Sequence, residues 1–372
     1  MSFDVVVTGA GVVGALAVEF LARRPEIRSI CVTDIDGKRA AGAAWRARVG
    51  AYQEGYDCRV EARTIDLSNV EAASETLAAL KPGVVFHTAT IVTVPEMAKG
   101  LSPEDFERVR RDGMAGFVPA HAYLAINLQA ALRNVSPCPR VVMAPFPDFT
   151  IPILSHLGDA PLTGIGNVDN IASALACIVA EDFGVPGSEV LPTVVAHHAV
   201  SEWFSRTGTA DKAPWFARVS IAGEDVTDRL DLNALMARTT ARLRGQSNES
   251  RVASSAVRAI LAILRDEGAY FHSAGANGLP GGWPVRLFAD RAELVEIPGL
   301  GFDEALAINV AGQRASGLES IEDDGTLVYS ETCSAMMDEL FEVKLGTVAA
   351  ADIAPLALEI RRCLSRRIAQ RA

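Results

Sequence analysis

The most constraining feature of the chain is a glycine-spaced turn near its start. DVVVT at 4–8 is a short run of apolar, mostly β-branched residues, which is typical of a buried strand. TGAGVVG at 8–14 follows it, with glycines at positions 9, 11 and 14, and the apolar residues from 13 to 21 then fall at helical spacing. A strand, a glycine turn and a helix in this order predict the first βα unit of a parallel sheet.

The alternation of strands and helices continues to about residue 150. The further predicted strands are 30–34, 59–66, 81–89 and 140–144, with helices at 70–80 and 121–135. Later segments have mixed periods: helices at 168–183, 254–268 and 352–370, a strand at 189–196 and a hairpin at 279–297. We therefore predict an α/β fold, with a Rossmann-type doubly wound parallel sheet in residues 1–150. Residues 151–372 are predicted to form an α+β domain for substrate binding, catalysis and oligomer contacts.

An acidic residue at the end of the second predicted strand indicates what the turn binds. Asp34 lies 20 residues after Gly14, where a carboxylate accepts hydrogen bonds from an adenosine ribose and repels a 2′-phosphate. We therefore expect NAD, and NADP less, although Lys38 and Arg39 follow the acid. The predicted cofactor-binding residues are Gly9, Gly11, Val12, Val13, Gly14, Asp34, Ile35, Asp66, Thr88 and Ala89.

Composition argues against several other classes of protein. The net charge of −11 disfavours a nucleic-acid partner, and no apolar run is long enough to cross a membrane. The six cysteines form no C-x-x-C pair or zinc-like spacing, and the start of the chain lacks a signal-peptide pattern, so we expect a cytoplasmic protein without a metal. The glycine register and the lack of a Y-x-x-x-K pair argue against a short-chain dehydrogenase.

Later segments extend these observations into a family resemblance. With GAGVVG, the acidic DID at 34–36, and the pair GNVDNIASAL and VVAHHA, the chain resembles a remote member of the lactate/malate dehydrogenase superfamily. SSAVRAILAIL is similar to that family's late active-site helix, and GLPGGWPVRLFADRAELVEI is similar to its closing hairpin. The resemblance implies an NAD-dependent oxidoreductase that acts on a small molecule, assembled as a homodimer or homotetramer.

The resemblance also implies catalytic residues. His197 follows Asp169 by 28 residues, close to the family's spacing between an aspartate and a catalytic histidine. A buried carboxylate that hydrogen-bonds to an imidazole lets the other ring nitrogen take a hydroxyl proton as the hydride leaves. We expect His197 to be the acid/base, with Asp169 as its partner and His198 as the alternative. Both histidines could instead be ordinary polar residues at a strand end.

The chain departs from the family where a substrate carboxylate would bind. Ala172 stands where the family has its carboxylate-binding arginine, and Ala144 or Phe146 stands in place of an asparagine. The arginines Arg108, Arg110 and Arg111 have no clear counterpart. Because alanine cannot replace a bidentate arginine, we expect a secondary alcohol or ketone without that carboxylate. AGANGLPGGW at 274–283, with Tyr270, His272 and Trp283, either lines the pocket or forms a plain hairpin turn.

Other functions remain open from the sequence. IDLSNVEAA after the third strand also suits opine- or saccharopine-type reductases, with Asp66 near the adenine. NAD-dependent glycosidases of this fold hold a metal through Cys and His, and the Cys-x-His element is absent. A dinucleotide-binding protein that has lost catalysis would explain the losses at positions 144 and 172.

Overall fold

A parallel sheet forms the first half of the molecule, in a computed structural model that describes residues 2–210, 212–243 and 249–371. Five parallel strands run in the order β3-β2-β1-β4-β5. They are β1 (Phe3–Thr8), β2 (Ser29–Asp34), β3 (Arg59–Thr64), β4 (Pro82–His87) and β5 (Arg140–Met143). The predicted strands and their parallel pairing are confirmed.

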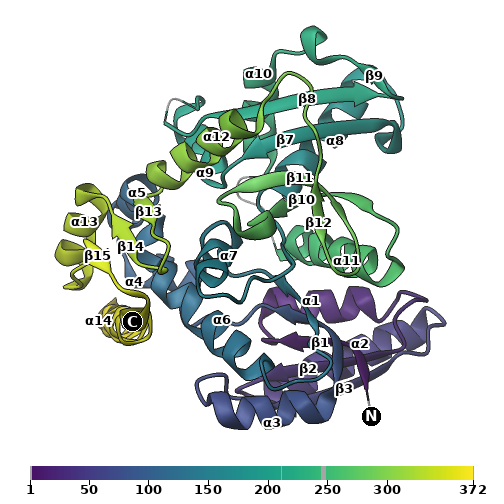
Figure 1. Cartoon of the computed structure of the whole chain (residues 1–372), viewed down its shortest axis with the longest axis vertical. Helices are drawn as coiled ribbons and strands as arrows, with labels where there is room; N and C mark the ends of the chain where they lie inside the picture. Colours follow the sequence, from purple (N-terminus) through teal and green to yellow (C-terminus); the bar gives the residue numbers. More distant parts are fainter. Residues whose placement is uncertain (1, 211, 244–248, 372) are drawn as a thin grey trace.

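Helices cover both faces of this sheet (Figure 1). Val5 and Val7 of β1 pack into the same core cluster as α1 (Val12–Leu21) and α2 (Gly37–Gln53). Val6 packs on the opposite face, with α3 (Val70–Leu80) and α6 (Val118–Leu132). Successive strand residues point to opposite faces, so a strand that is apolar throughout is covered on both sides. The predicted doubly wound arrangement is confirmed.

The same sheet continues into the second half of the chain. Beyond β5 the order is β6-β10-β11-β7-β8-β9, and the pairing after β6 is antiparallel. These strands are β6 (Thr163–Gly164), β7 (Val190–Ala196), β8 (Trp215–Ile221), β9 (Glu224–Asp225), β10 (Ala269–Ala274) and β11 (Gly282–Leu287), with β12 (Ala292–Leu294) beside β11. The predicted mixed second part is confirmed. The boundary near residue 150 stays a prediction, because β5 and β6 pair across it.

Helices of the second half pack around this extension. They are α7 (Pro147–His156), α8 (Val168–Phe183), α9 (Ala199–Thr207), α10 (Leu232–Leu243), α11 (Glu249–Arg265) and α12 (Phe302–Ala315). Short 3₁₀ turns lie at Met114–Phe117, Gly187–Glu189, Thr227–Arg229, Ala276–Gly278 and Ala350–Asp352. Among the helices that the structure describes, none combines the length and apolar character needed to cross a membrane.

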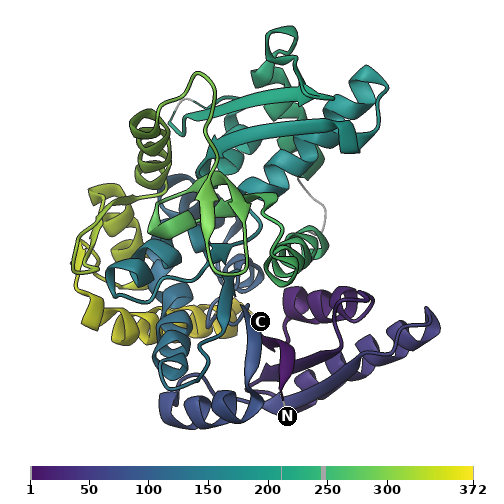
Figure 2. The same ribbon diagram turned by 45° about the vertical axis from the view of Figure 1, so that its right-hand side comes forward.

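The C-terminal segment returns to the first half of the molecule (Figure 2). It contains a small sheet, β13 (Leu318–Ile321), β14 (Leu327–Tyr329) and β15 (Thr347–Val348), and helices α13 (Glu331–Phe341) and α14 (Ile353–Arg371). α14 packs on α6 and on α4 (Val94–Gly100), which is followed by α5 (Pro103–Asp112). A Cβ at Gly100 would lie 2.6 Å from Leu364 Cδ1, so the glycine permits this close packing. The sequence did not predict this return.

Candidate functional site

The glycine turn has the geometry that its spacing predicts. Gly9 has a φ of +104°, and a Cβ there would lie 2.8 Å from the Ala89 nitrogen. A Cβ on Gly14 would lie 1.9 Å from the Gly9 carbonyl oxygen, so α1 approaches the turn as only glycine allows. Gly11 is the N-cap of α1, and a Cβ there would meet nothing within 4 Å. Gly9 and Gly14 therefore shape the turn, while Gly11 leaves open space at the helix N-terminus.

This contrast predicts different defects for two alanine variants. Gly14→Ala is expected to destabilise the fold by about 3 kcal/mol or more, because its Cβ clashes with backbone rather than with a movable side chain. Gly11→Ala is expected to keep the wild-type melting temperature within about 2 °C and to lose dinucleotide affinity at least about tenfold. Thermal melts and NADH titrations of both variants check this. An equal loss of stability in the two variants would contradict it.

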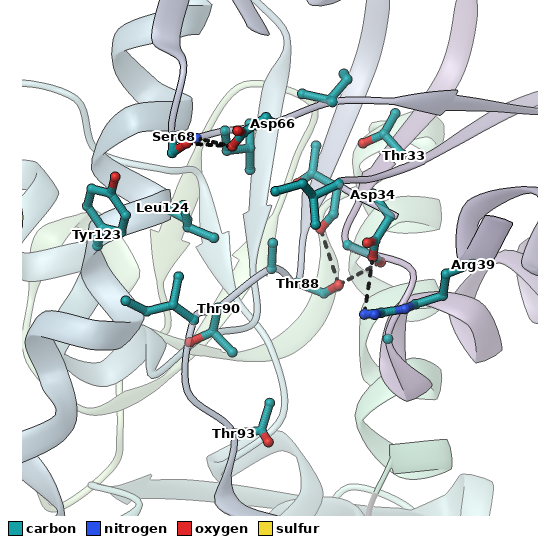
Figure 3. A pocket seen from close by; sticks show the side chains of 18 of the residues that line it. Thr33, Asp34, Arg39, Asp66, Ser68, Thr88, Thr90, Thr93, Tyr123 and Leu124 are labelled. Atoms are coloured by element: carbon teal, nitrogen blue, oxygen red, sulfur yellow. Dashed lines mark hydrogen bonds and ion pairs between the residues drawn. The ribbon is translucent and has the colours of Figure 1, made fainter. Parts of the chain in front are cut away.

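A cavity of about 600 Å³ opens beside the glycine turn, where strands β1 to β4 end (Figure 3). We call it the large cavity. Figure 3 shows Asp34 and Arg39 on one side of it, Tyr123 and Leu124 on the other, and Thr88 and Thr90 between. Seven of the predicted cofactor-binding residues line it: Gly9, Gly11, Asp34, Ile35, Asp66, Thr88 and Ala89. Of the others, Val12 and Val13 line neighbouring cavities and Gly14 is buried below the turn.

Asp34 also joins β2 to the glycine turn. Its Oδ2 accepts a hydrogen bond from the Ala10 N–H at 2.8 Å, and its Oδ1 accepts one from the Asp36 N–H at 2.9 Å. A carboxylate oxygen can accept more than one hydrogen bond, so both oxygens keep capacity for a ribose hydroxyl. The Arg39 guanidinium lies 3.8 Å from Asp34 and is the nearby group that suits a 2′-phosphate.

A second cavity of about 250 Å³ adjoins the large one and shares Thr88 and Thr90 with it. We call it the histidine cavity. Its other lining residues are Val13, His121, Ala144, Pro145, Phe146, Pro147, Asn167, His198 and Val252. No lysine or arginine is among these described residues. The cavity is therefore mostly apolar, with a few groups that can donate or accept hydrogen bonds.

His198 is one of the polar groups in this cavity and lies next to a buried acid. Its side chain is 15% exposed, and its Nδ1 lies 3.8 Å from Oδ2 of Asp148, a fully buried residue of α7. Burial raises the pKa of Asp148, and the nearby His198 charge and the Asn167 amide, which donates to Oδ2, oppose that rise. A buried carboxyl beside a half-open imidazole can stabilise a proton on the ring.

Two residues around this pair have backbone conformations that are unusual for non-glycine residues. Phe146 has a φ of +42° and Asn167 a φ of +41°. Such conformations cost on the order of 1–3 kcal/mol each and persist where the surrounding structure enforces them. Phe146 stacks on His121 with ring centroids 3.7 Å apart, and the Asn167 side chain donates to Asp148. The strained backbone thus positions both the ring stack and the buried acid.

His197 is in a different chemical state. Its side chain is fully buried, and its Nδ1 accepts a hydrogen bond from the Ala199 N–H at 3.2 Å. The proton of the neutral ring must then lie on Nε2. Burial lowers the pKa of His197 well below its ordinary value, and the nearby His198 lowers it further. A ring held in this way is poorly suited to take up and release a proton.

The structure does not bring Asp169 and His197 together as a hydrogen-bonded pair. Asp169 is buried at the start of α8 and forms an ion pair with Arg258 at 2.8 Å. Its pKa is raised by burial, and Arg258 opposes that rise. The Nδ1 of His197 is occupied by Ala199, and its Nε2 has no partner among the described residues. The acid beside the histidines is Asp148, whose Oδ2 lies 3.8 Å from Nδ1 of His198. The one signal for it was a lone acid in the apolar run APFPDFTIP.

Four other positions that the sequence analysis named line neither cavity. Arg108 pairs with Glu339 of α13 and Arg110 with Glu202 of α9, so these two arginines join helices, whereas Arg111 pairs with Asp112 of its own helix. Ala172 is a buried residue of α8.

The glycine-rich segment 274–283 connects β10 to β11, which supports the hairpin interpretation. Its neighbour His272 accepts from the Val194 N–H, and its Trp283 donates to the Pro280 carbonyl, so both side chains have structural partners.

Asp148, His197 and His198 form a cluster of side chains that could ligate a metal ion. Their possible ligand atoms lie within 4.8 Å of one another, and Asp148 Oδ1, His197 Nε2 and His198 Nδ1 have no hydrogen-bond partner among the described residues. A ligating imidazole needs a lone pair toward the metal and a proton on its other nitrogen. The Ala199 N–H donates to Nδ1 of His197, so the proton of the neutral ring lies on Nε2. The nitrogen that points into the cluster then has no free lone pair for a metal. The cluster therefore suits proton transfer better than metal binding.

Comparison with known proteins places the chain by its fold. No protein-family model and no curated protein matches the sequence. The structure is similar to a lactate dehydrogenase from Eimeria maxima with NADH and oxamate, with a TM-score of 0.61 and 16% identity over 83% of this chain and 91% of that one. It is also similar to the malate dehydrogenase of Picrophilus torridus, with a TM-score of 0.60 and 18% identity over 84% and 96%. A third similar structure is a lactate dehydrogenase from a Medee basin deep-sea metagenome, with a TM-score of 0.60 and 15% identity over 85% of this chain and 97% of that one. The predicted lactate/malate dehydrogenase-like fold is confirmed.

Proposed function

We propose that the chain is an NAD-dependent oxidoreductase that transfers a hydride between nicotinamide and the carbon of a secondary alcohol or ketone. The observation that carries the proposal is the junction of the two cavities at Thr88 and Thr90. The large cavity has the glycine turn and Asp34, which suit an adenine dinucleotide, and the histidine cavity has an ionisable ring. When bound, NAD supplies the hydride acceptor, and NADH supplies the hydride. The fold neighbours, which are lactate and malate dehydrogenases, support the same class of reaction.

The proton would be carried by His198. In alcohol oxidation the substrate hydroxyl gives its proton to the imidazole while its carbon loses a hydride, and in ketone reduction the ring returns the proton. The Nδ1 of His198 faces Asp148, which leaves the other ring nitrogen for the substrate oxygen. Asp148 would act as a positioning residue that favours the protonated ring. His197 would support the site as a neutral buried ring, in place of the catalytic role that its spacing predicts.

The lining of the histidine cavity favours an uncharged substrate. A 2-hydroxy acid needs a cation to bind its carboxylate, and no described lining residue is an arginine or lysine. Phe146, Pro145 and Val252 provide apolar contacts instead, and Thr90 and His121 provide polar ones. We infer a small substrate whose only essential polar group is the reacting oxygen. Assembly as a homodimer or homotetramer in the cytoplasm is part of this proposal and rests on the resemblance.

A calorimetric titration with NADH and, in parallel, NADPH tests the proposal. Micromolar binding of NADH with weaker binding of NADPH is expected, because Asp34 carries a negative charge at the ribose end of the large cavity. Preferred binding of NADPH would assign Arg39 the dominant role at that end. Binding without turnover on a panel of alcohols, ketones and mixtures of amines with keto acids would instead favour a binding protein without catalysis. No binding of either dinucleotide would overturn the proposal.

A further inference from the structure

The C-terminal helix contributes a cation to the large cavity. Arg361 of α14 lines this cavity, although it lies far along the chain from the glycine turn. Its Nη1 donates to Oε1 of Glu96 of α4 at 2.6 Å, and its side chain is 41% exposed. Among the described lining residues, the cations are Arg39 and Arg361. Arg361 is therefore the only one of these two that comes from outside the parallel-sheet half.

Both partners of this ion pair are held in place by their own helices. The buried Ile360 and Leu364 fix α14 against its neighbours, and Leu364 packs on Gly100 at the end of α4. Glu96 belongs to a capping box, in which its Oε2 accepts hydrogen bonds from the nitrogen and hydroxyl of Thr93. The packing of the two helices therefore holds the backbone of Arg361 at the rim of the large cavity.

Acidic groups outnumber basic ones among the described lining residues of the large cavity. The carboxylates Asp34, Asp66 and Glu96 line it together with only two guanidinium groups. Arg39 lies beside Asp34, and Arg361 pairs with one carboxylate at the rim of the cavity, that of Glu96. A dinucleotide brings two negative charges on its phosphates, and placing these beside three carboxylates is unfavourable without a cation.

We propose that Arg361 binds the phosphates of the dinucleotide, and that Glu96 holds the guanidinium in the free protein. This inference rests on the proposed function. Arg361 exchanges the Glu96 carboxylate for a phosphate oxygen, and a guanidinium suits both anions because its N–H groups match either geometry. The helix N-terminus at Gly11 and Arg361 of the C-terminal helix then bind the same anionic group, so the C-terminal segment is part of the cofactor site.

The test is a fluorescence titration of the full chain with NADH at two salt concentrations. Arg361→Ala is expected to weaken NADH binding by about tenfold and to flatten its salt dependence, because one charge-assisted contact is lost. The matched control is Arg362→Ala on the same helix, whose guanidinium is more exposed and faces Glu359. It is expected to stay within about twofold of the wild type. Arg361→Lys should fall between the wild type and the alanine variant.

A second variant removes the competing carboxylate without removing the helix cap. Glu96→Gln keeps the capping box, since glutamine also fills that position, and frees Arg361 from its ion pair. NADH is expected to bind this variant about threefold more tightly. If Arg361→Ala and Glu96→Gln both bind NADH as tightly as the wild type does, the role of Arg361 is overturned and the proposed function stands. Failure of the wild type itself to bind would overturn both.

Discussion

Replacing His198 by glutamine is expected to lower turnover by about 10²–10⁴-fold and to leave NADH affinity within about twofold. Glutamine can still donate or accept a hydrogen bond in the histidine cavity, but it cannot take up a proton near neutral pH. Position 198 lines the histidine cavity and not the large one, so the dinucleotide site should be unaffected. The measurement is kcat on the best alcohol or ketone from the substrate panel, together with calorimetry for NADH.

His197 provides the matched control. His197→Asn keeps an acceptor for the Ala199 N–H and is expected to retain turnover within about tenfold, at some cost in stability from the smaller side chain. If the asparagine variant were as inactive as His198→Gln while still folded, the roles of the two histidines would have to be exchanged.

The role of Asp148 follows from the same experiment. Asp148→Asn is expected to lower kcat by about 10-fold or more, because the amide cannot stabilise a positive ring. If Asp148 acts through His198, the double variant should turn over no more slowly than His198→Gln alone. Additive losses would mean that the carboxyl acts independently of the ring.

Local rules explain why the glycine turn and the acid beside it were predictable. Gly9, Gly11, Gly14 and Asp34 lie within one βαβ unit, where a tight turn, a helix start and a strand end are each set by a few neighbouring residues. Their placement in the structure matches the spacing in the sequence.

The cluster of Asp148, His197 and His198 depends on contacts that spacing does not determine. Asp169 starts a helix at the expected distance from His197, yet it binds Arg258, which lies 89 residues further on. Asp148 reaches His198 because the chain turns at Phe146, where a φ of +42° has no strong signature in the sequence. The contact of Arg361 with Glu96 joins residues 265 apart and depends on how α14 packs, which no local pattern encodes.

The free energy of unfolding is expected to fall steeply as the pH drops from about 6.5 to about 4.5. Burial lowers the pKa values of His87, His121 and His272 to about 3, and that of His197 well below its ordinary value. The unfolded chain takes up protons on these rings below its own histidine pKa, near 6.5, while the folded protein does not. The stability is therefore complete above about pH 6.5 and is lost as the pH falls toward 3, by about 1.4 kcal/mol per pH unit for each histidine.

Two buried carboxyls act in the opposite direction, because burial raises the pKa values of Asp148 and Asp169 and the folded state then binds their protons first. The four histidines outnumber the two carboxyls, so a net loss of stability is expected as the pH falls. Urea unfolding at pH 7.5, 6.5, 5.5 and 4.5 measures it. His87→Gln is expected to reduce the slope by about one proton, because the pKa of this buried ring is lowered to about 3. A flat profile would mean that the buried rings take up protons in the folded protein. His197 would then not be held neutral, and the reason for proposing His198 rather than His197 as the proton carrier would be lost.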